Sequence, residues 1–347
     1  MKWEDYKHNF INTAKQSDIR DKDITRYLEY AQYLYEQNLP IIYDQRHLCC
    51  LLGYKEEFIY SICNDSEKFY RHFSIRNKND KQRQIYEPLP ELKNIQSWIL
   101  HNILDNCIPS DYAKAYRKNY SLKDNVRFHR NQKKVLCLDI KSFFDFVSSW
   151  MVYQFFLELH YREDVAMMLT SLCCRNGCLP QGAPTSAALS NMVMKVFDEN
   201  VAQYCKEKRI RFTRYADDMT FSGDFKEIEA IRFVRSECKK LSMNINDEKT
   251  HVRKQGQQQR VTGIVVNEKI QVPLSLRREI RQNMYYIEKY GLDSHLHYIH
   301  EKRQNYLQHL LGQIEFALFI NPNDEKMSEY KEYLLNYIKN NTEDNSL

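Results

Sequence analysis

The stretch that most limits the fold is IRFTRYADDMTFSG, residues 210–223, in which two strand-like runs flank a pair of aspartates. Residues 210–213 and 219–221 alternate apolar and polar side chains, as half-buried strands do. Neighbouring side chains on a strand point to opposite faces, so Asp217 and Asp218 can converge on one object only if a tight turn redirects one of them. The sequence therefore predicts a hairpin with both carboxylates at or near its tip.

Two explanations fit this aspartate pair. Carboxylates this close repel each other, and a divalent cation that prefers oxygen ligands, magnesium or manganese, would relieve the repulsion. An ordinary Asp-Asp turn is the alternative, because aspartate tolerates turn conformations. These residues alone leave both open.

Composition narrows the class of protein. The chain has 347 residues, enough for about two domains, and its 43% hydrophobic and 28% charged residues are typical of a globular protein. No apolar run approaches a membrane span and the first residues, MKWEDYKHNF, lack a secretory stretch, so we expect no membrane association and a cytoplasmic location. The ten cysteines include no CxxC pair, so we expect buried, reduced thiols and no zinc site. The eight glycines form neither a GxGxxG nor a Walker loop, which excludes nucleotide binding by those two turns.

Positive charge is concentrated in three stretches. Five Lys or Arg and one Asp lie between residues 71 and 83, seven and one between 117 and 134, and four with no acid between 249 and 260. With 25 tyrosines in the chain, this pattern favours a nucleic acid whose phosphates meet cations and whose bases stack on rings. Solvated surfaces are the alternative for any single stretch.

A third carboxylate follows a buried-type strand upstream. Residues 135–138 form a short apolar run that Asp139 interrupts, and a carboxylate there is costly unless something pairs with it. Alone, such an aspartate is more often a strand-end residue than a metal ligand. Beside Asp217 and Asp218 it would complete a site for two metal ions about 4 Å apart, as used in phosphoryl transfer.

Between these segments lies CLPQGAPTSAALSNMV, where Pro180 and Pro184 frame Gly182 and a helix-like run begins at Ala187. The pattern predicts a rigid turn that feeds a helix and presents Gln181.

Four segments together resemble the reverse transcriptases. LDIKSFF, LPQGAPTS, RYADDMTFS and INDEKT resemble the family's palm motifs in order. Further segments resemble the bacterial retron branch: residues 83–100, RQIYEPLPELKNIQSWIL; residues 125–129, NVRFH; and residues 261–267, VTGIVVN. The likeness runs from about residue 38 to 320. It departs at Val126, where that branch usually has Ala, and at Asp145, where Pro commonly follows the Phe pair.

The resemblance implies an α+β right-hand polymerase with N-terminal helices (1–40), interleaved fingers (41–134) and palm (135–266, an antiparallel sheet plus helices), and a helical thumb with C-terminal helices (267–347). It implies that Asp139, Asp217 and Asp218 are catalytic and hold two Mg²⁺ ions, or Mn²⁺, with the Ile140 carbonyl. It also implies that the nucleotide is bound by Arg83, Phe144, Gln181 and Lys249. The implied RNA contacts are Asn125, His129, Val261, Thr262, Gly263, Arg277, Arg278 and Arg281, although a histidine satisfied within the core is the alternative for His129.

By the same resemblance, the reaction is RNA-templated DNA synthesis from dNTPs, with a structured noncoding RNA as template and primer. The expected partners are that RNA, its DNA product, a separate effector protein in anti-phage defence, and a host ribonuclease H, since no ribonuclease H domain is expected. Two alternatives remain open. One is another bacterial reverse transcriptase, of the abortive-infection or diversity-generating type, and the other is an RNA-binding scaffold for an effector.

Overall fold

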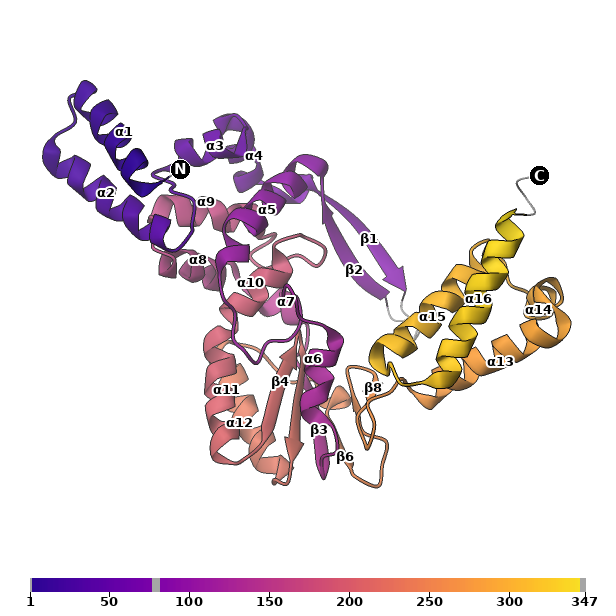
Figure 1. The fold of residues 1–347 in the computed structure, drawn as a ribbon. Helices are drawn as coiled ribbons and strands as arrows, with labels where there is room; N and C mark the ends of the chain where they lie inside the picture. Colours follow the sequence, from indigo (N-terminus) through magenta and orange to yellow (C-terminus); the bar gives the residue numbers. More distant parts are fainter. Residues whose placement is uncertain (1, 77–81, 344–347) are drawn as a thin grey trace. The chain divides into compact units, whose positions relative to one another are not determined.

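The computed structural model describes residues 2–76 and 82–343, and the chain divides into two compact units. Unit 1 comprises Met1–Asn119, Ile140–Gln203 and Ile231–Asn246, and unit 2 comprises Tyr120–Asp139, Tyr204–Ala230 and Asp247–Leu347. Two helices, α11 (Lys195–Glu207) and α12 (Glu227–Lys240), run from one unit into the other along the chain. Helices and antiparallel sheets both occur, which confirms the expected α+β class (Figure 1).

Unit 1 is mainly helical and carries one two-stranded antiparallel sheet, β1 (Tyr70–Arg76) with β2 (Gln82–Pro88). Its helices are α1 (Trp3–Gln16), α2 (Asp21–Glu36), α3 (Gln45–Leu52), α4 (Glu56–Asn64), α5 (Pro90–Asn102), α7 (Phe143–Phe146), α8 (Ser149–Glu158), α9 (Glu163–Cys173) and α10 (Ser186–Val193), with short 3₁₀ turns η1 (Ser66–Phe69) and η2 (Leu104–Asn106). The predicted helix after the proline-framed turn is therefore confirmed as α10, one residue earlier than expected. Residues 77–81 of the first basic stretch lie outside the described residues.

Unit 2 is built on a four-stranded antiparallel sheet in the order β4-β5-β3-β6. The strands are β3 (Lys134–Asp139), β4 (Arg211–Tyr215), β5 (Asp218–Gly223) and β6 (His251–Lys254). Strands β4 and β5 form the predicted hairpin, and β3 is the predicted apolar strand that ends in Asp139. Before the sheet come α6 (Leu122–Val126) and η3 (Arg127–His129), with Ser121 and Asp124 forming a capping box at the start of α6.

The rest of unit 2 follows the sheet in the chain. It consists of η4 (Asp247–Lys249), the short hairpin β7 (Arg260–Val261) and β8 (Ile264–Val265), and the helices α13 (Leu274–Tyr290), α14 (Leu292–Tyr298), α15 (Tyr306–Ile320) and α16 (Glu325–Glu343). One apolar core joins these helices to Val126, Val135, Val261 and Ile264. Within the described ranges, no helix combines the length and apolar character needed to cross a membrane.

The hairpin strands differ from the prediction in their burial. The sequence predicted half-buried strands with one wet face, but Thr213, Thr220 and Ser222 are at most 3% exposed. The reason is that Asn125 and His129 from α6 and η3 form hydrogen bonds with Thr213 and Ser222 on that face, so these two side chains are satisfied without water. Alternation of polar and apolar residues therefore marked two buried faces of different chemistry.

Candidate active site

The aspartates lie where two neighbouring strands meet the hairpin turn. Asp139 at the end of β3 is the register partner of Asp218 at the start of β5, and Asp139 is only 4% exposed. Tyr215 pairs with Asp218, so the hairpin turn consists of two residues, Ala216 and Asp217. Ala216 has φ +58°, the left-handed conformation that tight hairpin turns require. The predicted position of both carboxylates at the hairpin tip is confirmed.

The electrostatics of this cluster favour a cation. Burial, then the charges of Asp217 and Asp139, raise the pKa of Asp218 to about 6, and Lys249 partly opposes them. Lys249 Nζ lies 2.7 Å from Asp139 Oδ2. Burial lowers the pKa of Lys249, but the hydrogen bond to Asp139 and the aspartate charges outweigh it, so the pKa is raised and the amine stays charged.

The three carboxylates do not form a ready metal cage. Among residues 2–76 and 82–343, no three His, Cys, Asp or Glu side chains are grouped closely enough to hold a metal ion. Burial and the negative charges of Asp217 and Asp139 raise the pKa of Asp218, and Lys249 Nζ pairs with Asp139. The chemistry of the three carboxylates still fits a divalent metal ion, because carboxylate oxygens are the ligands that Mg²⁺ and Mn²⁺ prefer. Ile140, the expected carbonyl ligand, forms a single antiparallel bridge with Ile245.

The raised pKa of Asp218 predicts a pH-dependent stability. With a folded pKa of about 6 against 3.8 in the unfolded chain, this group's contribution is fully present below pH 3.8 and is lost as the pH rises through 6. Asp218→Asn should therefore raise the melting temperature of the metal-free protein at pH 7.5, and the gain should vanish below pH 4. Asp224→Asn is the control, because that exposed carboxylate is paired with Lys133. A melting temperature for Asp218→Asn at or below wild type at pH 7.5 would contradict the assignment.

Two of the predicted nucleotide-binding residues meet within unit 1. Arg83 Nε on β2 donates to Gln181 Oε1 at 2.8 Å, although 98 residues separate them in the sequence. The backbone carbonyl of Gln181 accepts a hydrogen bond from the backbone N–H of Tyr86, also on β2, at 2.8 Å. Gly182 has φ +120°, and a Cβ there would come 2.9 Å from the Tyr86 carbonyl, so only glycine allows this approach. The turn that presents Gln181 therefore brings its backbone close to β2.

The Phe pair lies in a helix and not in an extended segment, on which neighbouring rings would point to opposite faces. Phe143 and Phe144 begin the short helix α7, are 3% and 9% exposed, and stack edge to face with ring centroids 5.4 Å apart. Because successive helical residues are about 100° apart around the axis, the two rings do not point to opposite faces. Both rings are largely buried, with Phe144 the more accessible.

Several predicted RNA contacts are buried. Asn125, His129 and Val261 are at most 1% exposed, so these side chains are part of the interior of unit 2 and the core alternative for His129 describes it correctly. Val126, the departure from the usual Ala, is also fully buried. Thr262 and Gly263 form the two-residue turn between β7 and β8, with φ +45° and +85°.

The three arginines of α13 separate into two kinds. Arg277 pairs with Asp324 at 3.0 Å and is only 25% exposed, so its charge is used within unit 2. Arg278 and Arg281 are exposed. Sequence reasoning missed that Tyr285 and Lys289 extend the same exposed side of α13, a pattern visible in the spacing of four residues from 281 to 285 to 289. Lys289 Nζ lies 3.0 Å from the Tyr285 hydroxyl.

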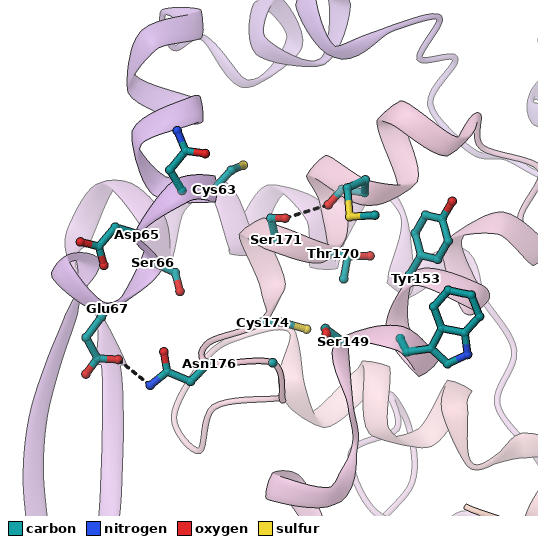
Figure 2. Close-up of a pocket in the computed structure, with 14 residues that line it drawn as sticks. Cys63, Asp65, Ser66, Glu67, Ser149, Tyr153, Thr170, Ser171, Cys174 and Asn176 are labelled. Atoms are coloured by element: carbon teal, nitrogen blue, oxygen red, sulfur yellow. Dashed lines mark hydrogen bonds between the residues drawn. The ribbon is translucent and has the colours of Figure 1, made fainter.

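A cavity of about 430 Å³ lies elsewhere in unit 1, between α4, η1, α8 and α9 (Figure 2). Its lining includes Cys63, Tyr153, Thr170 and Cys174, and none of the predicted site residues. The two carboxylates at its rim are already engaged, that of Asp65 with Lys68, and that of Glu67 with Arg175 and Asn176.

Known proteins resemble this chain over most of its length. Residues 75–266 match the family described as reverse transcriptase (RNA-dependent DNA polymerase). The chain is 30% identical over 256 residues to the retron Ec86 reverse transcriptase of Escherichia coli, covering 72% of this chain and 76% of that one. It is 29% identical over 291 residues to the retron Mx65 reverse transcriptase of Myxococcus xanthus, with 76% and 67% covered. A solved structure of telomerase from Candida albicans with a telomeric RNA fragment covers 86% of this chain and 66% of its own, at 12% identity and a TM-score of 0.47. From the family match and the retron relatives, this chain belongs to the reverse transcriptases, which are RNA-directed DNA polymerases, and within them to the bacterial retron branch.

Proposed function

We propose that the protein copies a structured, self-priming noncoding RNA into single-stranded DNA that stays joined to RNA. The observation that carries the proposal is the pairing of Asp139 with Asp218 across β3 and β5, with Asp217 in the adjoining turn. To test it, the purified protein is incubated with its copurified RNA, labelled dNTPs and Mg²⁺. Label should enter a strand that deoxyribonuclease degrades and that shortens after ribonuclease treatment, because the product is DNA joined to RNA. No labelled strand would contradict the proposal.

We assign roles on the basis of family membership and charge. Asp139, Asp217 and Asp218, with the Ile140 carbonyl, would hold two Mg²⁺ ions. When bound, such ions supply the charge that activates a sugar hydroxyl and holds the leaving pyrophosphate. Lys249 would neutralise or protonate that pyrophosphate, which its charged amine on Asp139 supports.

Arg83 and Gln181 are proposed to hold the incoming nucleotide together. Arg83 would bind the triphosphate and Gln181 the sugar or phosphates, and their hydrogen bond supports a shared site. The proposed right-hand division is N-terminal helices to residue 40, fingers to 134, palm to 266 and thumb beyond, with fingers and palm interleaved.

We propose that RNA lies along the exposed side of α13. Arg278 and Arg281 would contact phosphates, and Tyr285 with Lys289 would extend the contact by stacking and charge. The turn at Thr262 and Gly263 would lead the chain into this helix. Since the polymerase chemistry is indifferent to sequence, this region would also select the RNA.

The α13 proposal predicts a change in salt dependence. The double variant Arg278→Ala/Arg281→Ala should weaken RNA binding and lower the slope of log affinity against log salt by about 1.4 to 1.8, from roughly 0.7 to 0.9 per phosphate contact. Arg277→Ala is the matched control: it should lower the melting temperature, because Asp324 loses its partner, and leave the slope unchanged. Filter binding at several salt concentrations measures both. An unchanged slope in the double variant would place the RNA elsewhere.

The biological setting that we propose is anti-phage defence, with a separate effector protein and a host ribonuclease H that trims the template. Membership of the retron branch supports this setting.

A further inference from the structure

Two segments that mark the retron branch, residues 125–129 and 261–263, meet within unit 2, and Asn125, His129 and Val261 in them are buried. Asn125 and His129 contact the side chains of Thr213 on β4 and Ser222 on β5. These four polar side chains are at most 1% exposed. Burying polar side chains is costly unless their hydrogen bonds are made, so the partner of each polar atom shows what this site requires of these residues.

The hydrogen bonds form one chain with a single direction. Thr213 Oγ1 donates its only hydrogen to Asn125 Oδ1 at 2.6 Å, so it must accept from His129 Nε2 at 2.8 Å. His129 Nδ1 then carries no hydrogen and accepts from Ser222 Oγ at 2.7 Å. At the other end, Asn125 Nδ2 donates to Thr262 Oγ1 at 3.4 Å. We call Asn125, His129, Thr213 and Ser222 the polar bracket.

The bracket contacts both strands of the β4–β5 hairpin, which carries Asp217 and Asp218 and which we call the catalytic hairpin. Side chains alternate along a strand, so Ser222 lies on the same face of β5 as Asp218, which faces Asp139 in the register. Thr213 lies on the paired strand, two residues before the end of β4. His129 therefore spans the two strands that carry the Ala216 and Asp217 turn, on the face that bears Asp218. Burial, with a smaller effect of Arg211, lowers the pKa of His129 to about 3, so the ring stays neutral and its two bonds are fixed.

The far end of the bracket holds a strained turn. Thr262 has φ +45°, which is unfavourable for a β-branched residue, and the Asn125 amide contacts its hydroxyl. Val261, just before it, packs with Val126 in the apolar core that includes α13 and α15. The same helix segment, α6, thus touches the catalytic hairpin through polar groups and the turn before α13 through both kinds of contact.

We propose that the polar bracket positions the catalytic hairpin, fixing the β4 and β5 strands so that Asp217 and Asp218 can share metal ions with Asp139. This inference rests on the proposed metal role of the three aspartates. The bracket residues touch no reacting atom and are positioning residues. Their loss should act on metal use, because groups that orient metal ligands typically change metal affinity or activity by about 10- to 100-fold when removed.

The test compares Thr213→Val, which keeps the shape but loses both hydroxyl bonds, with Thr213→Ser, which keeps the hydroxyl. The measurement is the Mg²⁺ concentration for half-maximal primer extension, at a temperature well below the melting point of each variant. Thr213→Val should need about 10-fold more Mg²⁺ and show a lower kcat, with RNA affinity and dNTP KM within about twofold of wild type. Thr213→Ser should need a Mg²⁺ concentration close to that of the wild-type enzyme.

A wild-type Mg²⁺ requirement in folded Thr213→Val would overturn the proposal, since a purely structural role lowers only the melting temperature. If Thr213→Val does not fold, Ser222→Ala decides, because it removes one bond at the outer end. The Mg²⁺ concentration that Ser222→Ala needs for half-maximal extension should rise about threefold. An unchanged concentration would overturn the positioning role of the polar bracket. The metal role is tested separately: an active Asp217→Asn enzyme would refute it, whereas an inactive Asp217→Asn beside a normal Thr213→Val refutes the bracket alone.

Discussion

Asp217→Asn is expected to abolish DNA synthesis while leaving RNA affinity within about twofold of wild type. The substitution removes a carboxylate from the turn of the catalytic hairpin, and no phosphate contact is assigned to it. Losing about 4 kcal/mol of metal-dependent stabilisation corresponds to a rate reduction of roughly 1,000-fold. Phosphate contacts dominate RNA affinity, and those are assigned to α13, so binding should persist.

Single-nucleotide primer extension, with filter binding in parallel, measures both properties. Asp224→Asn is the matched control, since it makes the same chemical change in an exposed carboxylate that is paired with Lys133 just beyond β5. It should retain nearly full activity. Residual synthesis by Asp217→Asn above about a tenth of wild type would show that the catalytic site is elsewhere.

Phe144→Ala is expected to admit ribonucleotides while retaining some DNA synthesis. The resemblance implies that Phe144, five residues past Asp139, lies under the nucleotide's sugar, and Phe144 is the more accessible of the two rings of α7. A ring packed against C2′ leaves no space for a hydroxyl, and overpacking costs about 1 to 3 kcal/mol. Discrimination against ribonucleotides should therefore fall by roughly 5- to 150-fold.

The measurement is primer extension with dNTP and rNTP in parallel, below the melting point of each variant. Because Phe144 is largely buried, its truncation also leaves a cavity, and Phe143→Ala controls for that loss. Phe143→Ala should lower stability and keep the preference for dNTP. An unchanged preference for dNTP over rNTP in Phe144→Ala would show that Phe144 does not exclude ribonucleotides.

The catalytic hairpin and β3 could be predicted because their signals are local. An apolar run that ends in Asp139, and strand patterns on both sides of the aspartate pair, specify strands and a turn without knowledge of the rest of the chain. The family motifs then indicated which carboxylates belong together.

Contacts between distant residues could not be predicted. Nothing in the sequence marks Arg277 as the partner of Asp324, or places Gln181 against Arg83. The resemblance to the retron branch implied that the segment NVRFH contacts RNA. Its Asn125 and His129 are instead buried, because Thr213 and Ser222 offer matching hydrogen bonds from strands more than 80 residues away.

The most direct test of the central claim is to sequence the nucleic acid that copurifies with the wild-type protein and with Asp217→Asn. We expect the wild-type protein to carry one RNA together with a DNA strand complementary to part of it, and Asp217→Asn to carry the same RNA without DNA. RNA without complementary DNA on both proteins would contradict the account and favour a scaffold that holds RNA.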